Sequence, residues 1–129
     1  MEEAIGKLIL RLGFGGMMLT HGWPKLEKLL AGGEIKFSDP FGIGPGVTLA
    51  LVVFAEFICA ILLIIGYKTR LAAIPLIITM AVAGFYIHAE DAFSSKEKAF
   101  LYLAGFIVIA LIGPGKYSLD YKTSKFQMK

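Results

Sequence analysis

VTLALVVFAEFICAILLIIG, residues Val47 to Gly66, is an apolar run interrupted by a single charged residue, Glu56. In a helix, about 20 residues reach about 30 Å, which is the hydrocarbon thickness of a bilayer. No turn residue breaks the run before Gly66, so division into strands is disfavoured. Glu56 lies near its centre, where an ionised carboxylate is most costly. The run predicts a membrane-spanning helix with an acid at mid-depth.

The composition of the whole chain also indicates a membrane protein. The 129 residues are 57% hydrophobic and 18% charged, with a mean hydropathy of +0.72. Soluble domains carry about 25% charged residues. The net charge of +3 comes from lysines spread between apolar segments, so we expect no nucleic-acid partner. The single cysteine, Cys59, excludes a disulfide framework and a cysteine-based metal cluster within one chain.

Three further segments are predicted to be spanning helices, at about residues 3–20, 71–88 and 95–112, in addition to the helix at 47–66. We therefore predict a single all-α domain, a four-helix antiparallel transmembrane bundle with a long first extramembrane loop and a polar tail at 113–129. Within the loop, Pro24–Leu30 can form a short amphipathic piece. Ser94 and Glu97 have the spacing of a capping box.

The first helix carries a charge that is predicted to point into the bundle. At 100° per residue, one face of this helix collects Arg11, Gly15, Met18 and Gly22. The glycines leave room beside the arginine and favour close helix contact in lipid.

The distribution of cations predicts that both termini face the cytoplasm. Seven cations lie at the end of the bundle with the termini, against five at the other end. The first set is Lys7, Lys68, Arg70, Lys116, Lys122, Lys125 and Lys129, and the second is Lys25, Lys28, Lys36, Lys96 and Lys98.

The polar residues of the helices admit both structural and functional interpretations. Arg11 and Glu56 are predicted at similar depths, so they can form an ion pair, and Glu56 can also serve as a proton site. His21 and His88 are predicted at one level above Glu56. They are either interfacial, hydrogen-bonded residues, or proton donors to a quinone carbonyl, or ligands to a metal or haem, with haem ranked below quinone. The structural interpretation of Lys25 is an interfacial side chain, and that of Tyr102 is packing.

Four pieces of the sequence resemble the DoxX family of bacterial four-helix membrane proteins. The first is Arg11-x-x-x-Gly15 followed by His21-Gly22-x-x-Lys25, which is similar to the family's first-helix signature. The others are Glu56 with the later LLIIGYKTRLAA, Glu97-x-x-x-Leu101-Tyr102-Leu103, and GPGKYSLD, which ends in Asp120. They occur in order over nearly the whole chain. One departure is Cys59-Ala60, where relatives often carry small glycines.

The resemblance implies a protein of the bacterial inner membrane and a subunit of a quinone-linked oxidoreductase. On this view Glu56, His21 and His88 are the catalytic residues, and Arg11, Lys25 and Tyr102 bind the cofactor, a quinone. A partner protein would supply the redox centre, and a homo-oligomer is compatible with the pattern. No metal site is expected.

Two other functional classes stay open. One is a small-molecule carrier that uses Arg11 as an anion anchor and Glu56 as a proton-coupled gate. The other is an assembly or chaperone-like subunit that binds a client protein, as in more distant relatives of the family. For the quinone interpretation, we expect a cavity between the first three helices, with Glu56 at its floor, His21 and His88 near its mouth, and small residues around it, namely Gly15, Gly22, Ala60, Ala81 and Gly84.

Overall fold

The computed structural model describes residues 1–127, and those residues contain helices and no strand. Lys129, counted above among the cations, lies outside the described residues. The helices are α1 (Glu2–Leu30), α2 (Pro45–Val53), α3 (Ala60–Ile65), α4 (Thr69–Val82), α5 (Phe93–Ile112) and α6 (Leu119–Gln127). Two π-helical segments, η1 (Phe54–Cys59) and η2 (Ala83–Ile87), continue α2 and α4 without a break, so that α2, η1 and α3 form one rod.

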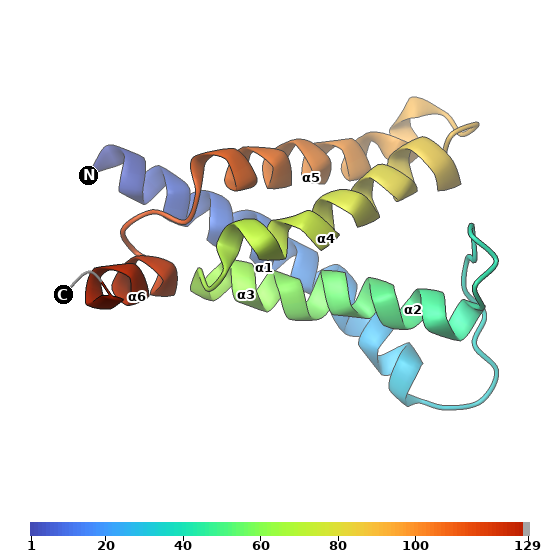
Figure 1. Cartoon of the computed structure of the whole chain (residues 1–129). Helices are drawn as coiled ribbons and strands as arrows, with labels where there is room; N and C mark the ends of the chain where they lie inside the picture. The colour runs from blue at the N-terminus through green and yellow to red at the C-terminus, as the bar shows by residue number, and fades with distance from the viewer. Residues whose placement is uncertain (128–129) are drawn as a thin grey trace.

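The helices are splayed at one end and joined at the other (Figure 1). The rods α2–α3 and α4 meet at the turn Gly66–Lys68 and diverge away from it, while α1 crosses behind them. Both chain termini lie near this turn, and we call this end the terminal end. The long connection 31–44 lies at the opposite end, here called the loop end.

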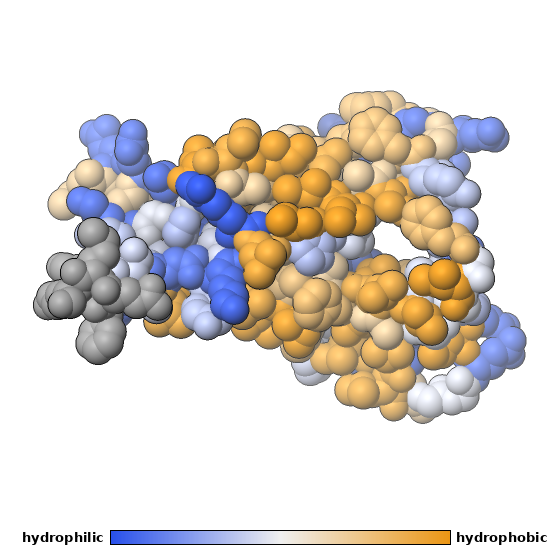
Figure 2. Space-filling model, in the orientation of Figure 1, coloured by the Kyte–Doolittle hydropathy of each residue, from blue (hydrophilic) through white to orange (hydrophobic). Residues whose placement is uncertain are grey.

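Two segments are long and apolar enough to cross a membrane, Pro45–Ile65 with 21 residues and Thr69–Ile87 with 19. Large hydrophobic side chains are exposed along the outside of the helices, for example Leu51, Ile78 and Leu111. Figure 2 shows hydrophobic residues over the length of the molecule and hydrophilic residues mainly towards its two ends. Soluble proteins rarely expose so much continuous apolar surface. The outside is therefore suited to lipid.

Small residues bring the helix backbones into contact, as is favoured in lipid. A Cβ on Gly22 would lie 2.6 Å from the carbonyl carbon of Glu56, and a Cβ on Gly15 would lie 3.2 Å from the carbonyl oxygen of Ala60. This stripe of α1 thus packs directly on η1 and α3. The buried core also includes Met18, Ala55, Cys59, Leu63, Ala72, Ala73, Leu76, Met80, Phe106 and Ile109.

The first helix is longer than predicted, because it runs to Leu30 through Pro24 instead of ending near Thr20. A proline inside a helix costs about 3 kcal/mol. The contact of Gly22 with η1, and the ion pair of Lys25 described below, hold the turns on either side of Pro24 against the second rod.

The start of α5 and the structure of the tail also differ from the predictions. Helix α5 begins at Phe93 after Ala92, two residues before the expected start at Ser95, and no side chain caps it. The predicted capping box at Ser94 and Glu97 is therefore wrong, since both residues lie inside the helix. Part of the tail predicted to be polar forms α6, a helix that was not predicted.

Candidate functional site

The acid of the second rod is paired with a lysine of α1. The Nζ atom of Lys25 lies 2.7 Å from both Oε1 and Oε2 of Glu56 and donates hydrogen bonds to both. The Glu56 side chain is only 2% exposed, while that of Lys25 is 32% exposed. A buried charge is tolerated when it is paired and hydrogen-bonded. The pair therefore explains how a carboxylate is kept in the middle of an apolar rod.

The two π-helical segments flank this ion pair. Glu56 lies within η1, and Ala83, the first residue of η2, lines the same cavities as Glu56. In a π-helix the backbone hydrogen bonds join residues i and i+5 instead of i and i+4, and such segments are frequent at functional sites. Local widening of both rods at the same level is a feature that helical periodicity did not predict.

A cavity of about 190 Å³, here called the polar cavity, brings together five of the six residues named from the sequence. His21 and Lys25 come from α1, Glu56 from η1, His88 from the end of η2 and Tyr102 from α5. Sequence reasoning missed Ser95 and Lys98 of α5, which also line it. Lys98 lies four residues before Tyr102, and Ser95 lies three before Lys98, so all three share one helical face, which was the available signal.

Aromatic contacts fix one wall of the polar cavity. The rings of His21 and Tyr102 meet edge to face, with centroids 5.8 Å apart. Tyr102 in turn packs against Phe14 and Phe106, at 6.1 and 5.8 Å. At the opposite side, Nδ1 of His88 lies 2.8 Å from Oδ2 of Asp91. The two histidines thus have different neighbours, one aromatic and one acidic.

The shape of the cavity differs from the expected one in two respects. Helix α5 supplies part of the wall, whereas the cavity was expected between the first three helices. The glycines do not line it, because Gly22 packs against the backbone of η1 and Gly84 against the ring of Phe100. Their small size serves helix contact.

Arg11 does not belong to this site, and its predicted pairing with Glu56 is wrong. Its Nη1 atom donates hydrogen bonds to the carbonyl oxygens of Leu63 and Ile64, at 3.3 and 2.9 Å, and its Nη2 donates to that of Tyr117. The last carbonyls of a helix have no partner within it, and cations are favoured there. The buried guanidinium therefore caps the end of α3 and ties the tail to it.

Asp120 makes the complementary contact at the start of α4. Its two carboxylate oxygens accept hydrogen bonds from the backbone N–H groups of Lys68, at 2.7 Å, and Thr69, at 2.8 Å. Acidic groups are favoured at helix N-termini. The end of α3 and the start of α4 thus meet at one turn and are capped by charges of opposite sign.

A second cavity of about 220 Å³, here called the apolar cavity, lies beneath the long connection at the loop end. It is formed by Phe37–Ile43 of that connection, by Thr48–Val52 of α2 and by Ile78–Ile87 of α4 and η2. Lys25 and Glu56 line it as well, so the ion pair lies between the two cavities.

Asp39 holds the connection against the start of α2. Its carboxylate accepts hydrogen bonds from the Gly44 N–H at 2.9 Å, the Ile43 N–H at 3.1 Å and the Thr48 hydroxyl at 2.9 Å. Desolvation raises the pKa of Asp39, but the hydrogen bonds from Thr48 and from the backbone of residues 42–44 outweigh it, and the net pKa is lowered. The ionised form therefore organises this part of the loop.

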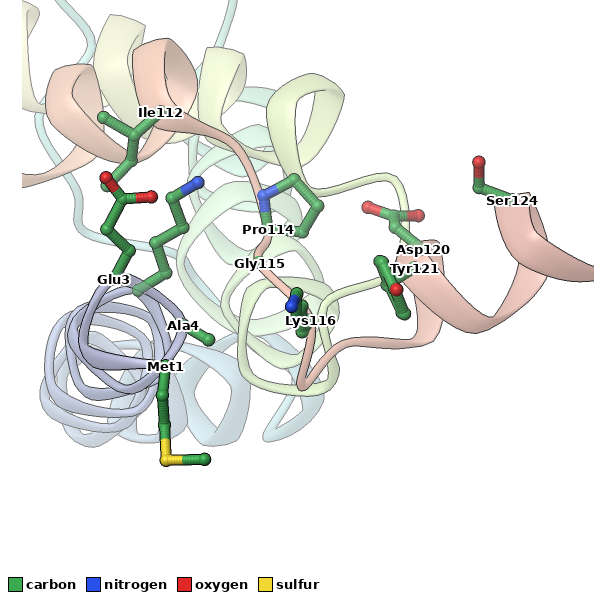
Figure 3. A pocket seen from close by; sticks show the side chains of 11 residues that line it. Met1, Glu3, Ala4, Ile112, Pro114, Gly115, Lys116, Asp120, Tyr121 and Ser124 are labelled. Carbon is green, nitrogen blue, oxygen red and sulfur yellow. The ribbon is translucent and has the colours of Figure 1, made fainter.

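A third pocket, of about 490 Å³, lies at the terminal end between the start of α1, the end of α5 and the start of α6 (Figure 3). Its charged residues are mixed in sign, with Lys7 and Lys116 beside Glu3 and Asp120. Within residues 1–127, no three His, Cys, Asp or Glu side chains are grouped as metal ligands would be.

Comparison with known proteins gives one family and several relatives. The DoxX family model matches residues 6–89. The inner membrane protein YqjF of Escherichia coli is 28% identical over 127 residues, which cover 95% of each chain. An uncharacterized protein of Haemophilus influenzae is 30% identical over 92% of this chain and 83% of its own. The uncharacterized membrane protein Rv3486 of Mycobacterium tuberculosis is 30% identical over 74% of each chain. No solved structure matches the chain.

Proposed function

The chain belongs to the DoxX family of integral membrane proteins, and from that premise we propose that it binds a quinone or quinol in the polar cavity and handles protons there. The observation that carries the proposal is the convergence of His21, Lys25, Glu56 and Tyr102 on one cavity in an otherwise apolar protein. A concave site with a few converging polar groups is the usual form of a small-molecule site.

The ion pair leaves hydrogen-bonding capacity for a ligand. An ammonium group has three N–H donors, and Lys25 uses two of them on Glu56. Its third donor is suited to a quinone carbonyl. Glu56 and His21 then provide groups that accept the protons of a quinol, and the Tyr102 ring offers an apolar surface for the ligand ring.

Oxidation of a quinol releases two protons and two electrons. In our proposal the protons pass to Glu56 and His21 and then to water past the partly exposed Lys25. The electrons go to a redox partner protein. The chain is thus proposed as the quinone-binding subunit of an oxidoreductase.

We further propose four membrane crossings with both termini in the cytoplasm. The support is the presence of four long helical segments with both chain ends at the terminal end, together with the bias of cations towards that end. Reporter fusions test this topology. A reporter fused after residue 129 should be found in the cytoplasm, and a reporter inserted at Gly33 should be found in the periplasm. The reverse pattern would contradict the proposal.

The single tryptophan, Trp23, provides the test of quinone binding. It lies two residues before Lys25, and its ring centroid is 6.0 Å from that of Phe57 in η1. We would titrate the purified protein in dodecyl maltoside with 2,3-dimethoxy-5-methyl-1,4-benzoquinone and follow quenching of its fluorescence. Saturable quenching that Glu56→Gln weakens about tenfold supports the proposal. Quenching that is linear in quinone and equal in both proteins contradicts it.

An assembly subunit without a small-molecule ligand is the second candidate. It is favoured by the role of Arg11, whose charge is used on backbone carbonyls of α3 and the tail. The same contacts occupy the Arg11 guanidinium, which argues against its use as the anion anchor of a carrier. Co-purification of a stoichiometric client protein, with no quinone extracted from the preparation, would favour this candidate over the first.

A further inference from the structure

We infer that the apolar cavity beneath the loop holds the aliphatic chain of the ligand whose polar ring occupies the polar cavity. The ligand class is thus an amphiphile with a hydrogen-bonding ring and a hydrocarbon tail. The inference rests on the proposed function for the position of the ring in the polar cavity. It adds the position of the aliphatic chain in the apolar cavity.

The chemistry of the apolar cavity favours a hydrocarbon. Away from the ion pair its lining is mostly aliphatic and aromatic, with Phe37, Phe41, Leu51, Val52 and Val82 among its residues. Two of its hydroxyl groups are already used. That of Thr48 donates to Asp39, and that of Thr79 donates to the carbonyl oxygen of Pro75. Cavities with few free polar groups hold apolar ligands better than ordered water.

The two cavities adjoin along one wall. Lys25, Glu56, Met80 and Ala83 line both of them. Alone, neither cavity reaches the roughly 300–1,000 Å³ usual for small-molecule sites, whereas the two together fall within that range. A ligand whose ring accepts a hydrogen bond from Lys25 is therefore adjacent to the apolar cavity, and its chain reaches that cavity if these shared side chains move aside.

The apolar cavity also offers entry from the bilayer. Leu51 and Ile78, at its edge, are each 58% exposed on the lipid-suited surface. Figure 2 shows hydrophobic residues on both sides of a hollow at the loop end. Along α2 and η1 the cavity extends from Thr48 to Glu56, roughly 12 Å of helix. A chain of several methylene groups can thus enter sideways and lie along α2.

The loop closes the cavity on the side away from the helices. The Tyr86 hydroxyl donates to the carbonyl oxygen of Pro40 at 3.3 Å, and the rings of Phe41 and Tyr86 lie 5.6 Å apart. Asp39 fixes the other end of the same turn to α2. The connection is thus held as a cover over an apolar space.

The test compares two quinones with the same ring, 2,3-dimethoxy-5-methyl-1,4-benzoquinone and its 6-decyl derivative. Affinities are measured by Trp23 quenching in wild type and in Val52→Phe and Val82→Phe, which add bulk to the apolar cavity alone. The matched control is Val108→Phe on α5, a half-exposed residue that lines neither cavity.

We expect the decyl quinone to bind wild type at least about tenfold more tightly than the chainless quinone. Val52→Phe and Val82→Phe should remove this advantage and leave the affinity for the chainless quinone unchanged, whereas Val108→Phe should change neither. If both quinones bind wild type equally, or if the advantage survives both cavity variants, the inference is overturned and the proposed function stands. If neither quinone binds wild type, the proposed function fails and the inference with it.

A labelling experiment on wild type removes any dependence on the folding of the variants. The probe is the same quinone with a diazirine at the end of the decyl chain, and the labelled residues are located by mass spectrometry. The inference expects labels within residues 37–43, 48–52 or 78–87. Labels confined to the outer face of α5, between Leu101 and Leu111, would overturn it.

Discussion

The ammonium group of Lys25 donates hydrogen bonds to both carboxylate oxygens of Glu56, and the glutamate side chain is buried while the lysine side chain is about one-third exposed. The two partners are therefore not equivalent. Without its lysine, the enclosed carboxylate has no other hydrogen-bond partner among the described residues. Without its acid, the long lysine side chain can direct its ammonium towards the membrane interface.

This asymmetry predicts unequal effects of the two single substitutions. Lys25→Met should destabilise the protein by roughly 3 kcal/mol because it leaves a buried carboxylate unpaired. Glu56→Gln should cost only about 1 kcal/mol. The double variant should be more stable than Lys25→Met alone. Thermal unfolding of wild type, the two single variants and the double variant in one detergent gives the double-mutant cycle. If the destabilisations of the two single variants add up to that of the double variant, the residues do not pair directly.

Gly22 should tolerate no side chain. Gly22→Ala places a Cβ against the carbonyl group of Glu56, so α1 must move away from η1. We expect a loss of about 2 kcal/mol or more and a weaker Lys25–Glu56 pair. Gly13→Ala is the matched control, since a Cβ there meets nothing within 4 Å. It should be neutral or stabilising by up to about 1 kcal/mol. Equal melting temperatures of the two variants would contradict the close packing.

Arg11→Met should release the tail from the end of α3. The substitution leaves the carbonyls of Leu63, Ile64 and Tyr117 without this donor. A buried unsatisfied group lowers the free energy of unfolding by about 1–3 kcal/mol. Trypsin cleavage after Lys116 and Lys122 should become faster, whereas Lys96→Met, whose ammonium group contacts Ala89 at the loop end, should leave it unchanged. A tail as resistant to trypsin as in wild type would argue against the cap.

Acid should loosen the loop through Asp39. Because the pKa of Asp39 is lowered in the folded protein, its ionised form contributes stability above the pKa of the unfolded chain. That contribution is lost as the pH falls through the folded pKa, below about pH 4. Acid protease digestion of residues 31–44, compared between wild type and Asp39→Ala, measures it. Wild type should be protected at pH 5 and approach the variant at pH 3, and a constant difference between them would contradict the role of Asp39.

Helical periodicity predicted four of the five buried residues of α1, and the fifth, Ala4, was not predicted. Arg11, Gly15, Met18 and Gly22 share one face and are all buried. The enclosed position of Glu56 likewise followed from its place in the apolar run. Both conclusions depend only on local geometry.

The partners of the charged residues could not be predicted in the same way. The prediction that Arg11 pairs with Glu56 assumed that two residues at the same depth in the membrane are in contact. Which residues are in contact depends instead on how α1 crosses the second rod. Its continuation through Pro24 brings Lys25 level with Glu56, and Arg11 lies near the last turn of α3. The π-helical segments and the contribution of α5 to the polar cavity likewise depend on how the helices pack together, which local periodicity does not report.

The contact between Arg11 and Tyr117 joins residues that are 106 positions apart in the sequence. A ribosome that has just completed α1 must still add every residue from Ala31 to Tyr117 before that carbonyl group exists. Until then the Arg11 guanidinium can reach the carbonyls of α3 but not that of the tail. The tail can therefore close the terminal end only after the four long helical segments have been made.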